Sequence, residues 1–201
     1  MPLGAFKAAL MGTAGATTEG DVVLLSTTTA SNAATVSITS GIDSTYGEYI
    51  FRFYNLNPAT DNVNFEFQVN AAGASGYNET MTTTSFAAVH EEDDDGGTVS
   101  YSTDKDQAQG TAFQPLTDDQ GNGGDESAAG ELHLFNPSST TYAKHFYTRV
   151  NEYYYDGGEG YQGTKEHYIS GYINTTTAID DIQFKMASGN FDGTIKLWGV
   201  K

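Results

Sequence analysis

Apolar and polar residues alternate one by one in three stretches of the chain, at residues 63–69, 182–186 and 194–198. Successive side chains of a β-strand point to opposite faces of the sheet. The alternation therefore predicts three strands, each with one buried and one solvent-exposed face. In the last stretch Trp198 falls on the face opposite the apolar residues Ile195 and Leu197.

Further runs are rich in Val, Ile, Thr, Tyr and Phe and are bounded by Gly, Asn, Asp and Ser, a composition typical of short strands. Helix signals are nearly absent, apart from a turn or two at residues 5–11. About ten strands without intervening helices predict an all-β fold, an antiparallel β-sandwich that is jelly-roll-like. The less regular predicted strands are Val22–Thr28, Thr35–Thr39, Glu48–Tyr54, Met81–Val89, Thr98–Tyr101, Glu131–Phe135, Lys144–Val150 and His167–Ile173.

Two turn motifs predict which strands are neighbours. A proline fixes φ within Asn57–Asp61, and the flanking Asn and Asp favour turn hydrogen bonds. We therefore expect a hairpin between Tyr49–Tyr54 and Val63–Val69. Asp192-Gly193 is a favoured two-residue hairpin turn that would join the last two strands. The final strand, Thr194–Lys201, is then expected to be an inner strand of a sheet.

The length of the chain suits one domain. It has 201 residues, of which 38% are hydrophobic, and no linker divides it, so we predict a single β-sandwich domain at residues 21–201. Residues 1–20 are predicted to be a short apolar N-terminal arm, which either anchors the domain to a partner or packs on the domain itself. The apolar side chains of the arm belong to Leu3, Phe6, Leu10 and Met11.

Charge and cysteine content exclude several classes of partner and site. The formal net charge is −17, with only nine Lys and Arg residues. Such a surface repels phosphate backbones and anionic lipids, so we predict no nucleic-acid partner. No apolar run has the length of a membrane span, which argues against membrane insertion. The absence of cysteine excludes disulfides and thiolate metal sites.

The sequence also lacks the motifs of nucleophilic and cofactor chemistry. It has no G-x-S-x-G, no phosphate-binding glycine motif, and no histidine in a metal-binding spacing. We therefore predict that the protein is not an enzyme and holds no cofactor. The enzymatic alternative is glycoside hydrolysis, because a jelly roll can place two carboxylates about 5–5.5 Å apart across a concave sheet. Glu48, Glu66 and Glu131 lie on or beside predicted strands.

Acidic residues gather in two places that could suggest calcium. The run of five acids at 91–95 is interpreted as a solvated loop, because adjacent side chains in an extended run diverge. Residues 118–129 partly match a calcium loop, with Asp118, Asn122 and Glu126 as weak candidate ligands. Gln120 and Ala129 stand where that loop requires an acidic or amide residue and a bidentate glutamate. We predict no metal.

The segment 151–162 combines four tyrosines with Gly, Asn and Gln. Tyrosine gives a large contact area at low entropic cost, and glycine lets a loop adapt, so this composition is typical of a contact surface for protein or sugar. Tyr153, Tyr155 and Tyr161 are the candidate contact residues. The alternative is that Tyr153 and Tyr155 end a strand and cover the edge of the core.

Two segments carry a resemblance to a known group of proteins. Residues 40–78 contain a turn, a Tyr-rich strand, Asn-Pro-Ala-Thr-Asp, an alternating strand and a Gly-rich tail, and residues 186–201 end in Gly-Thr-Ile-Lys-Leu-Trp-Gly. Together they resemble small β-sandwich structural proteins of bacteriophage virions, such as tail-fibre modules. The resemblance covers about a quarter of the chain. It implies a jelly-roll or lectin-like sandwich, a location on the surface of the virion particle and a homo-oligomer, of which a trimer is one form.

The main functional hypothesis is a phage structural module, either a tail fibre or appendage or a capsid-decoration protein. Its partners would be copies of itself, other virion proteins and a host surface glycan. The first alternative is a carbohydrate-binding module in which Tyr153, Tyr155, Tyr161 and Trp198 stack on sugar rings, although the terminal-strand position of Trp198 favours a core role. The second alternative is the glycosidase.

Overall fold

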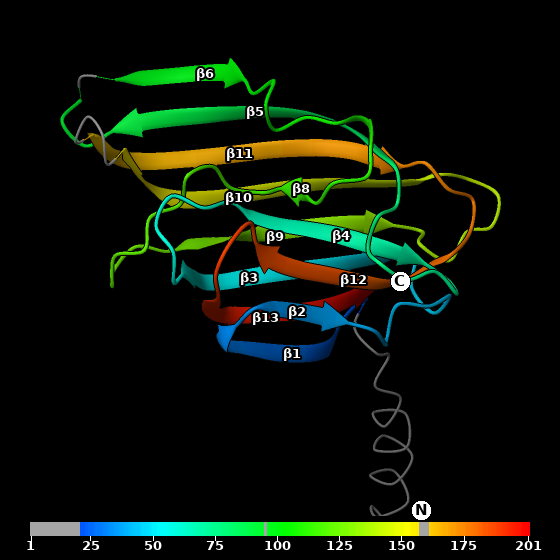
Figure 1. The fold of residues 1–201 in the computed structure, drawn as a ribbon. Helices are drawn as coiled ribbons and strands as arrows, with labels where there is room; N and C mark the ends of the chain where they lie inside the picture. The colour runs from blue at the N-terminus through cyan, green and yellow to red at the C-terminus, as the bar shows by residue number, and fades with distance from the viewer. Residues whose placement is uncertain (1–20, 95, 157–160) are drawn as a thin grey trace, which may run out of the picture.

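The computed structural model describes residues 21–94, 96–156 and 161–201, which form two antiparallel β-sheets packed together (Figure 1). This described part confirms the all-β antiparallel sandwich and contains no helix, and thus none long and apolar enough to cross a membrane. Its strands are β1 (Val22–Ala33), β2 (Thr35–Ile38), β3 (Glu48–Pro58), β4 (Phe65–Ala71), β5 (Met81–Glu91), β6 (Gly97–Tyr101), β7 (Ala108–Gly110), β8 (Gln114–Pro115), β9 (Ala128–Phe135), β10 (Lys144–Asp156), β11 (Tyr161–Ile173), β12 (Ile179–Met186) and β13 (Phe191–Val200).

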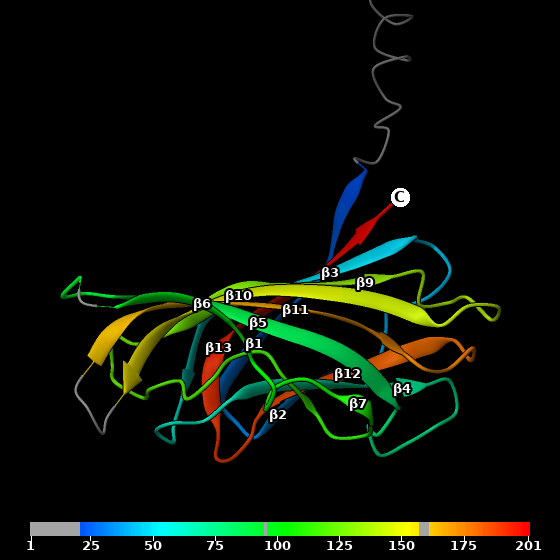
Figure 2. The same ribbon diagram turned by 90° about the horizontal axis from the view of Figure 1, so that it is seen from above.

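The two sheets differ in width. The large sheet has nine strands in the order β1-β13-β3-β9-β10-β11-β5-β6, with β7 added on β5, and the small sheet has the order β2-β12-β4-β8. Seen from above, the small sheet lies on one side of the large sheet, and no described strand covers the other side (Figure 2). We call that uncovered side the open face. It carries, among others, Arg52, Glu131, Arg149 and Phe86.

The core between the sheets is built on phenylalanine rings. The ring centroid of Phe53 in the large sheet lies 5.3 Å from those of Phe65 and Phe184 in the small sheet, and Phe65 and Phe184 stack at 5.8 Å. Such contacts combine burial of large apolar surfaces with favourable ring geometry. The alternation predicted at 182–186 and 194–198 is confirmed, because the apolar members are buried and Trp198 lies on the opposite face from Leu197.

Both predicted hairpins are wrong. β3 and β4 belong to different sheets, as do β12 and β13, so each chain reversal carries the chain across the sandwich. The second reversal occurs before β13, with Gly189 at φ +75°, and Asp192 and Gly193 lie inside that strand. Strands with one apolar face bury it better by facing each other than by pairing edge to edge. The inner position of the last strand is confirmed, since β13 lies between β1 and β3.

The predicted exposed face of β4 is also partly wrong. Gln68 and Asn70 are buried, because the chain that leads into β8 covers this side of the small sheet. The Gln68 side-chain amide donates to the carbonyls of Glu79, Thr111 and Ala112. A buried glutamine therefore satisfies backbone groups of an irregular segment that has no strand partner of its own.

Candidate functional site

One row of side chains crosses the open face from β13 to β6. Strand pairing places these residues in succession, each opposite the next on the neighbouring strand. Their neighbours along each strand, such as Phe51, Phe53 and Val150, point into the core. The row therefore lies on the surface across almost the full width of the large sheet, and consists of Lys196, Arg52, Glu131, Arg149, Tyr168, Phe86 and Tyr101.

The β5–β6 end of the row is aromatic and exposed. The Phe86 ring stacks on Tyr168 with centroids 4.9 Å apart, and the Arg149 guanidinium lies 5.7 Å from the centroid of Tyr168. Phe86 and Tyr101 are 41% and 54% exposed, and Val99 beside them is 72% exposed. Contiguous exposed apolar side chains of this kind mark contact surfaces.

The middle of the row is charged and contains both arginines of the chain. Arg52 Nε lies 3.5 Å from Glu131 Oε2, and Arg149 Nε donates to Glu166 Oε1. The hydrogen bond to Glu166 raises the pKa of Arg149. Exposed ion pairs stabilise a fold little, but they hold each guanidinium in a defined orientation on the surface.

A hollow of about 280 Å³ lies between these arginines. Its centre is Ala129, a short, exposed side chain on β9 that is surrounded by longer ones. A bulge in β3 between Phe53 and Leu56, with Asn55 at φ +51°, interrupts the pairing of β3 with β9 at the same level. The hollow thus results from one small residue next to one local break in the ladder.

His133 lies between two of the glutamates considered for glycoside hydrolysis. Its Nδ1 is 2.5 Å from Glu48 Oε1, its Nε2 is 3.3 Å from Glu131 Oε1, and its ring stacks on Tyr147 at 4.4 Å. Glu48 and Glu131 therefore share the open face, with an imidazole ring in the space that a glycosidic bond would need. Glu66 lies on the small sheet, where burial raises its pKa and the Lys185 ammonium is 3.6 Å away.

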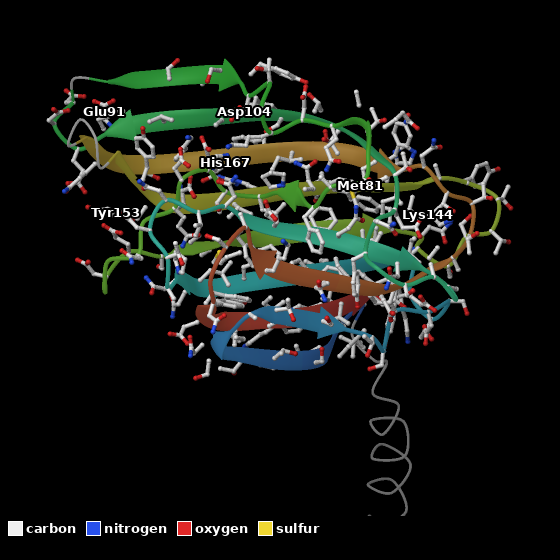
Figure 3. All side chains as sticks on the ribbon, viewed as in Figure 1. Met81, Glu91, Asp104, Lys144, Tyr153 and His167 are labelled. Carbon is white, nitrogen blue, oxygen red and sulfur yellow. The ribbon has the colours of Figure 1, made fainter. Side chains whose placement is uncertain are left out.

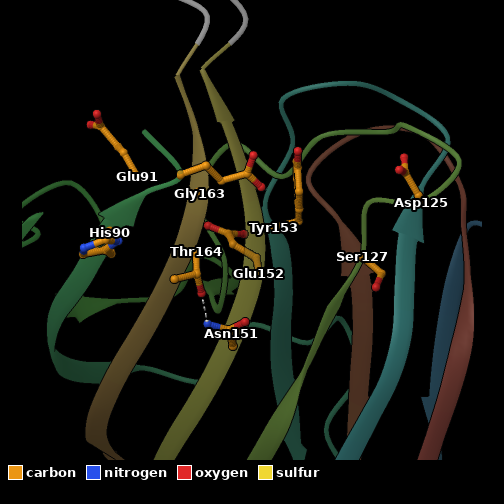
Figure 4. Close-up of a pocket in the computed structure, with 10 residues that line it drawn as sticks. His90, Glu91, Asp125, Ser127, Asn151, Glu152, Tyr153, Gly163 and Thr164 are labelled. Atoms are coloured by element: carbon orange, nitrogen blue, oxygen red, sulfur yellow. Dashed lines mark hydrogen bonds between the residues drawn. The ribbon is translucent and has the colours of Figure 1, made fainter. Parts of the chain in front are cut away.

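A separate hollow, at one end of the large sheet, is lined by one of the predicted contact tyrosines (Figure 4). It measures about 400 Å³ and is lined by Glu91, Asp125, Tyr153 and others. The hydroxyl of Tyr153 donates to Gln162 Oε1 at 3.0 Å. The side chains of Tyr155 and Tyr161 lie outside the described residues. The structure therefore places Tyr153 at a surface hollow and says nothing of the other two.

The weak calcium candidates do not converge. Asp118 pairs with Lys105 and Lys165, while Glu126 Oε2 accepts a hydrogen bond from the Gly123 amide. Asn122 donates instead to the Ala59 carbonyl. In the described part of the chain, no three His, Asp or Glu side chains are arranged to hold a metal ion.

A buried polar cluster inside the sandwich was not predicted. His167 Nε2 is 2.7 Å from Glu152 Oε1, both side chains are buried, and the Asp118 amide donates to the same carboxylate (His167 is labelled in Figure 3). Burial raises the pKa of Glu152, and the His167 hydrogen bond opposes that rise. The two-residue period of a strand could have predicted that both side chains face the interior, because Glu152 follows the buried Val150 by two positions and His167 precedes the buried Ile169 by two.

The arm residues Leu3, Phe6, Leu10 and Met11 lie outside the described residues. Trp198 is half-buried on the open face, with Leu24 and Ile50 as its strand partners. No protein-family model matches the chain, and no curated protein sequence matches it either.

Proposed function

We propose that the protein is a non-enzymatic surface module of a bacteriophage particle, with a jelly-roll or lectin-like sandwich, and that its open face is the contact surface. The observation that carries this proposal is the row of exposed aromatic and paired arginine side chains across the uncovered sheet. Aromatic residues and arginine are enriched at protein interfaces and dominate their energetics. A flat face of this composition suits adhesion or assembly.

The virion location rests on the two segments that resemble phage structural proteins. In the structure, residues 40–78 include β3 and β4, and residues 186–201 include β13. β3 and β13 are neighbours in the large sheet and supply Arg52, Tyr54 and Lys196 to the open face. The segments that carry the resemblance therefore supply part of the face to which we assign contact.

The partners are copies of the same chain and other virion proteins. A net charge of −17 makes copies repel each other at low ionic strength, so self-association is expected to strengthen as salt screens this repulsion. A tail-fibre or appendage module would occur in a few or a few dozen copies per particle, whereas a capsid-decoration protein would occur in hundreds.

The proposal is tested on intact particles of the phage that encodes the chain. Antibodies against the recombinant protein should label purified particles, and quantitative mass spectrometry should give the copy number. The double variant Phe86→Ser/Tyr101→Ser should fold normally, because both side chains are exposed. We expect either its incorporation into particles or the adhesion of those particles to the host to be several-fold lower than for wild type. A chain found only in the soluble fraction of infected cells, and never on particles, overturns the proposal.

A carbohydrate-binding module is the second candidate. The hollow between the arginines favours it, because it combines an apolar surface with the charged side chains of Arg52, Glu131 and Arg149. The two candidates are compatible, since a virion module can adhere to its host through a sugar.

A further inference from the structure

We infer that the hollow over Ala129 binds one neutral pyranose ring of a glycan. This inference rests on the proposed function only in taking the open face as the contact surface. It assigns a specific subsite and a ligand class to one part of that face.

The shape of the hollow suits a single ring. Its volume of about 280 Å³ lies just below the range of about 300–1,000 Å³ that is typical of small-ligand sites. Its floor is the short side chain of Ala129 and the adjoining backbone of Phe53 and Gly130, so a ring can approach the sheet closely. The surrounding side chains are long and stand up from the sheet as a wall.

The wall alternates hydrogen-bond donors with acceptors. Arg52 and Arg149 use Nε in their ion pairs, which leaves their terminal amino groups as further donors. Glu131 and Glu166 supply carboxylate acceptors. Asn151 Nδ2 donates to Thr164 Oγ1 at 2.7 Å, which leaves its Oδ1 as an acceptor for a ligand. Sugar hydroxyls donate and accept at once, so neighbouring hydroxyls on one ring fit such an alternation.

Tyr54 provides an apolar wall beside these polar groups. Tyr54 as a whole residue is 39% exposed, and the Lys196 ammonium lies 5.3 Å from the centroid of its ring. The cation packs on the ring and restricts its position. The C–H face of a pyranose can pack on such a ring while its hydroxyls reach the guanidinium and carboxylate groups.

Charge decides between neutral and acidic sugars. A uronic acid or sulfated sugar would bring an anion next to Glu131 and Glu166, on a protein whose net charge is −17. Each arginine is already neutralised by its glutamate partner. The electrostatic balance therefore favours a ligand without charge.

The experiment uses a glycan array of neutral and acidic oligosaccharides, followed by calorimetric titration of the full chain with the strongest neutral ligand. Ala129→Leu fills the hollow at an exposed position and is expected to weaken binding by about tenfold or more. Arg149→Lys keeps the charge but loses the planar fork, and is expected to weaken binding several-fold. The matched control is Thr27→Leu, an exposed position on β1 that pairs with Lys196 and does not line the hollow, which should leave binding unchanged.

The outcomes separate this inference from the proposed function. Binding that survives Ala129→Leu, in a protein whose thermal melting is unchanged, overturns the site. A preference for uronic-acid or sulfated glycans overturns the ligand class. A wild-type chain that binds no neutral glycan at millimolar concentration overturns the inference, while antibody labelling of particles independently decides the proposed function.

Discussion

The interior of the sandwich has two halves of different chemistry. Under β13, β3 and β9, the core is apolar and centred on Phe53 and Phe184. Under β10, β11 and β5, apolar residues such as Phe146 and Ile169 share the interior with the buried polar residues Glu152, His167 and Gln114. Eight strands lie side by side across the large sheet and four across the small one, so the outer strands of the large sheet extend beyond the small sheet. The inner side of these outer strands is covered largely by chain that is not part of a strand.

Irregular chain imposes polar side chains on the surface that it covers. Its backbone groups have no strand partner, and a buried unpaired N–H or C=O is costly. Gln114 shows the solution, because its Oε1 accepts from Thr83 Oγ1 at 2.8 Å and its Nε2 donates to the Lys105 carbonyl at 2.7 Å. Gln120 similarly donates to the Leu56 carbonyl. Burial of apolar surface therefore stabilises one half of the interior, and in the other half hydrogen bonds between buried polar groups and the backbone contribute as well.

Among single substitutions, the largest expected loss of stability is in the apolar half. Phe184→Ala removes a ring that contacts Phe51, Phe53 and Phe65, and should lower the free energy of unfolding by about 4 kcal/mol. The control Phe86→Ala, on the open face, should cost under about 1 kcal/mol. Urea unfolding measures both. Similar losses for the two variants would contradict the assignment of the core.

In the polar half, Asp118→Asn should cost about 2 kcal/mol at neutral pH. The substitution leaves Lys105 and Lys165, whose side chains are nearly buried, without their shared carboxylate. The magnitude is below that of a fully buried pair because Asp118 is partly solvated. Chemical unfolding of the variant measures the loss, and a variant as stable as wild type would show that water replaces the carboxylate.

The same variant, Asp118→Asn, should change how the free energy of unfolding depends on pH. Burial raises the pKa of Asp118, but hydrogen bonds from Lys105 and Lys165 outweigh burial and hold this pKa below 3.8. The contribution of Asp118 is therefore complete well above pH 3.8 and is lost as the pH falls through its lowered folded pKa. The stability difference between wild type and variant should shrink below pH 3.8. A difference that stays constant down to pH 2 would refute this linkage.

A smaller effect is expected at Gln114. Gln114→Leu keeps the volume but leaves Thr83 Oγ1 and the Lys105 carbonyl without their partner, which should cost about 1.5 kcal/mol. The matched control is Gln183→Leu on the outer side of the small sheet, where the side chain bonds only to Ser37 Oγ in an exposed setting. Hydrogen exchange at residues 105–116 should increase in the first variant alone.

The sequence could predict strands because the two-residue period of a strand is local. The hairpins that it predicted at Asn57–Asp61 and Asp192-Gly193 are wrong, since a turn motif reports a reversal of the chain and not the sheet that the chain enters next. The alternation indicates that Glu152 faces the interior, but it could not show the hydrogen-bond partners of this carboxylate, because His167 lies on another strand and the segment with Asp118 is irregular. The hollow over Ala129 depends on Tyr54 and Arg149, which strand register brings together from far apart in the chain.

The position of β13 has a consequence for biosynthesis. It is the last described strand to leave the ribosome, yet it lies between β1 and β3, which are among the first. Until it emerges, these two early strands present unpaired edges and the large sheet is incomplete. Folding of this sheet is therefore completed only after translation of residues 191–200, and nascent chains need protection from edge-to-edge aggregation during synthesis.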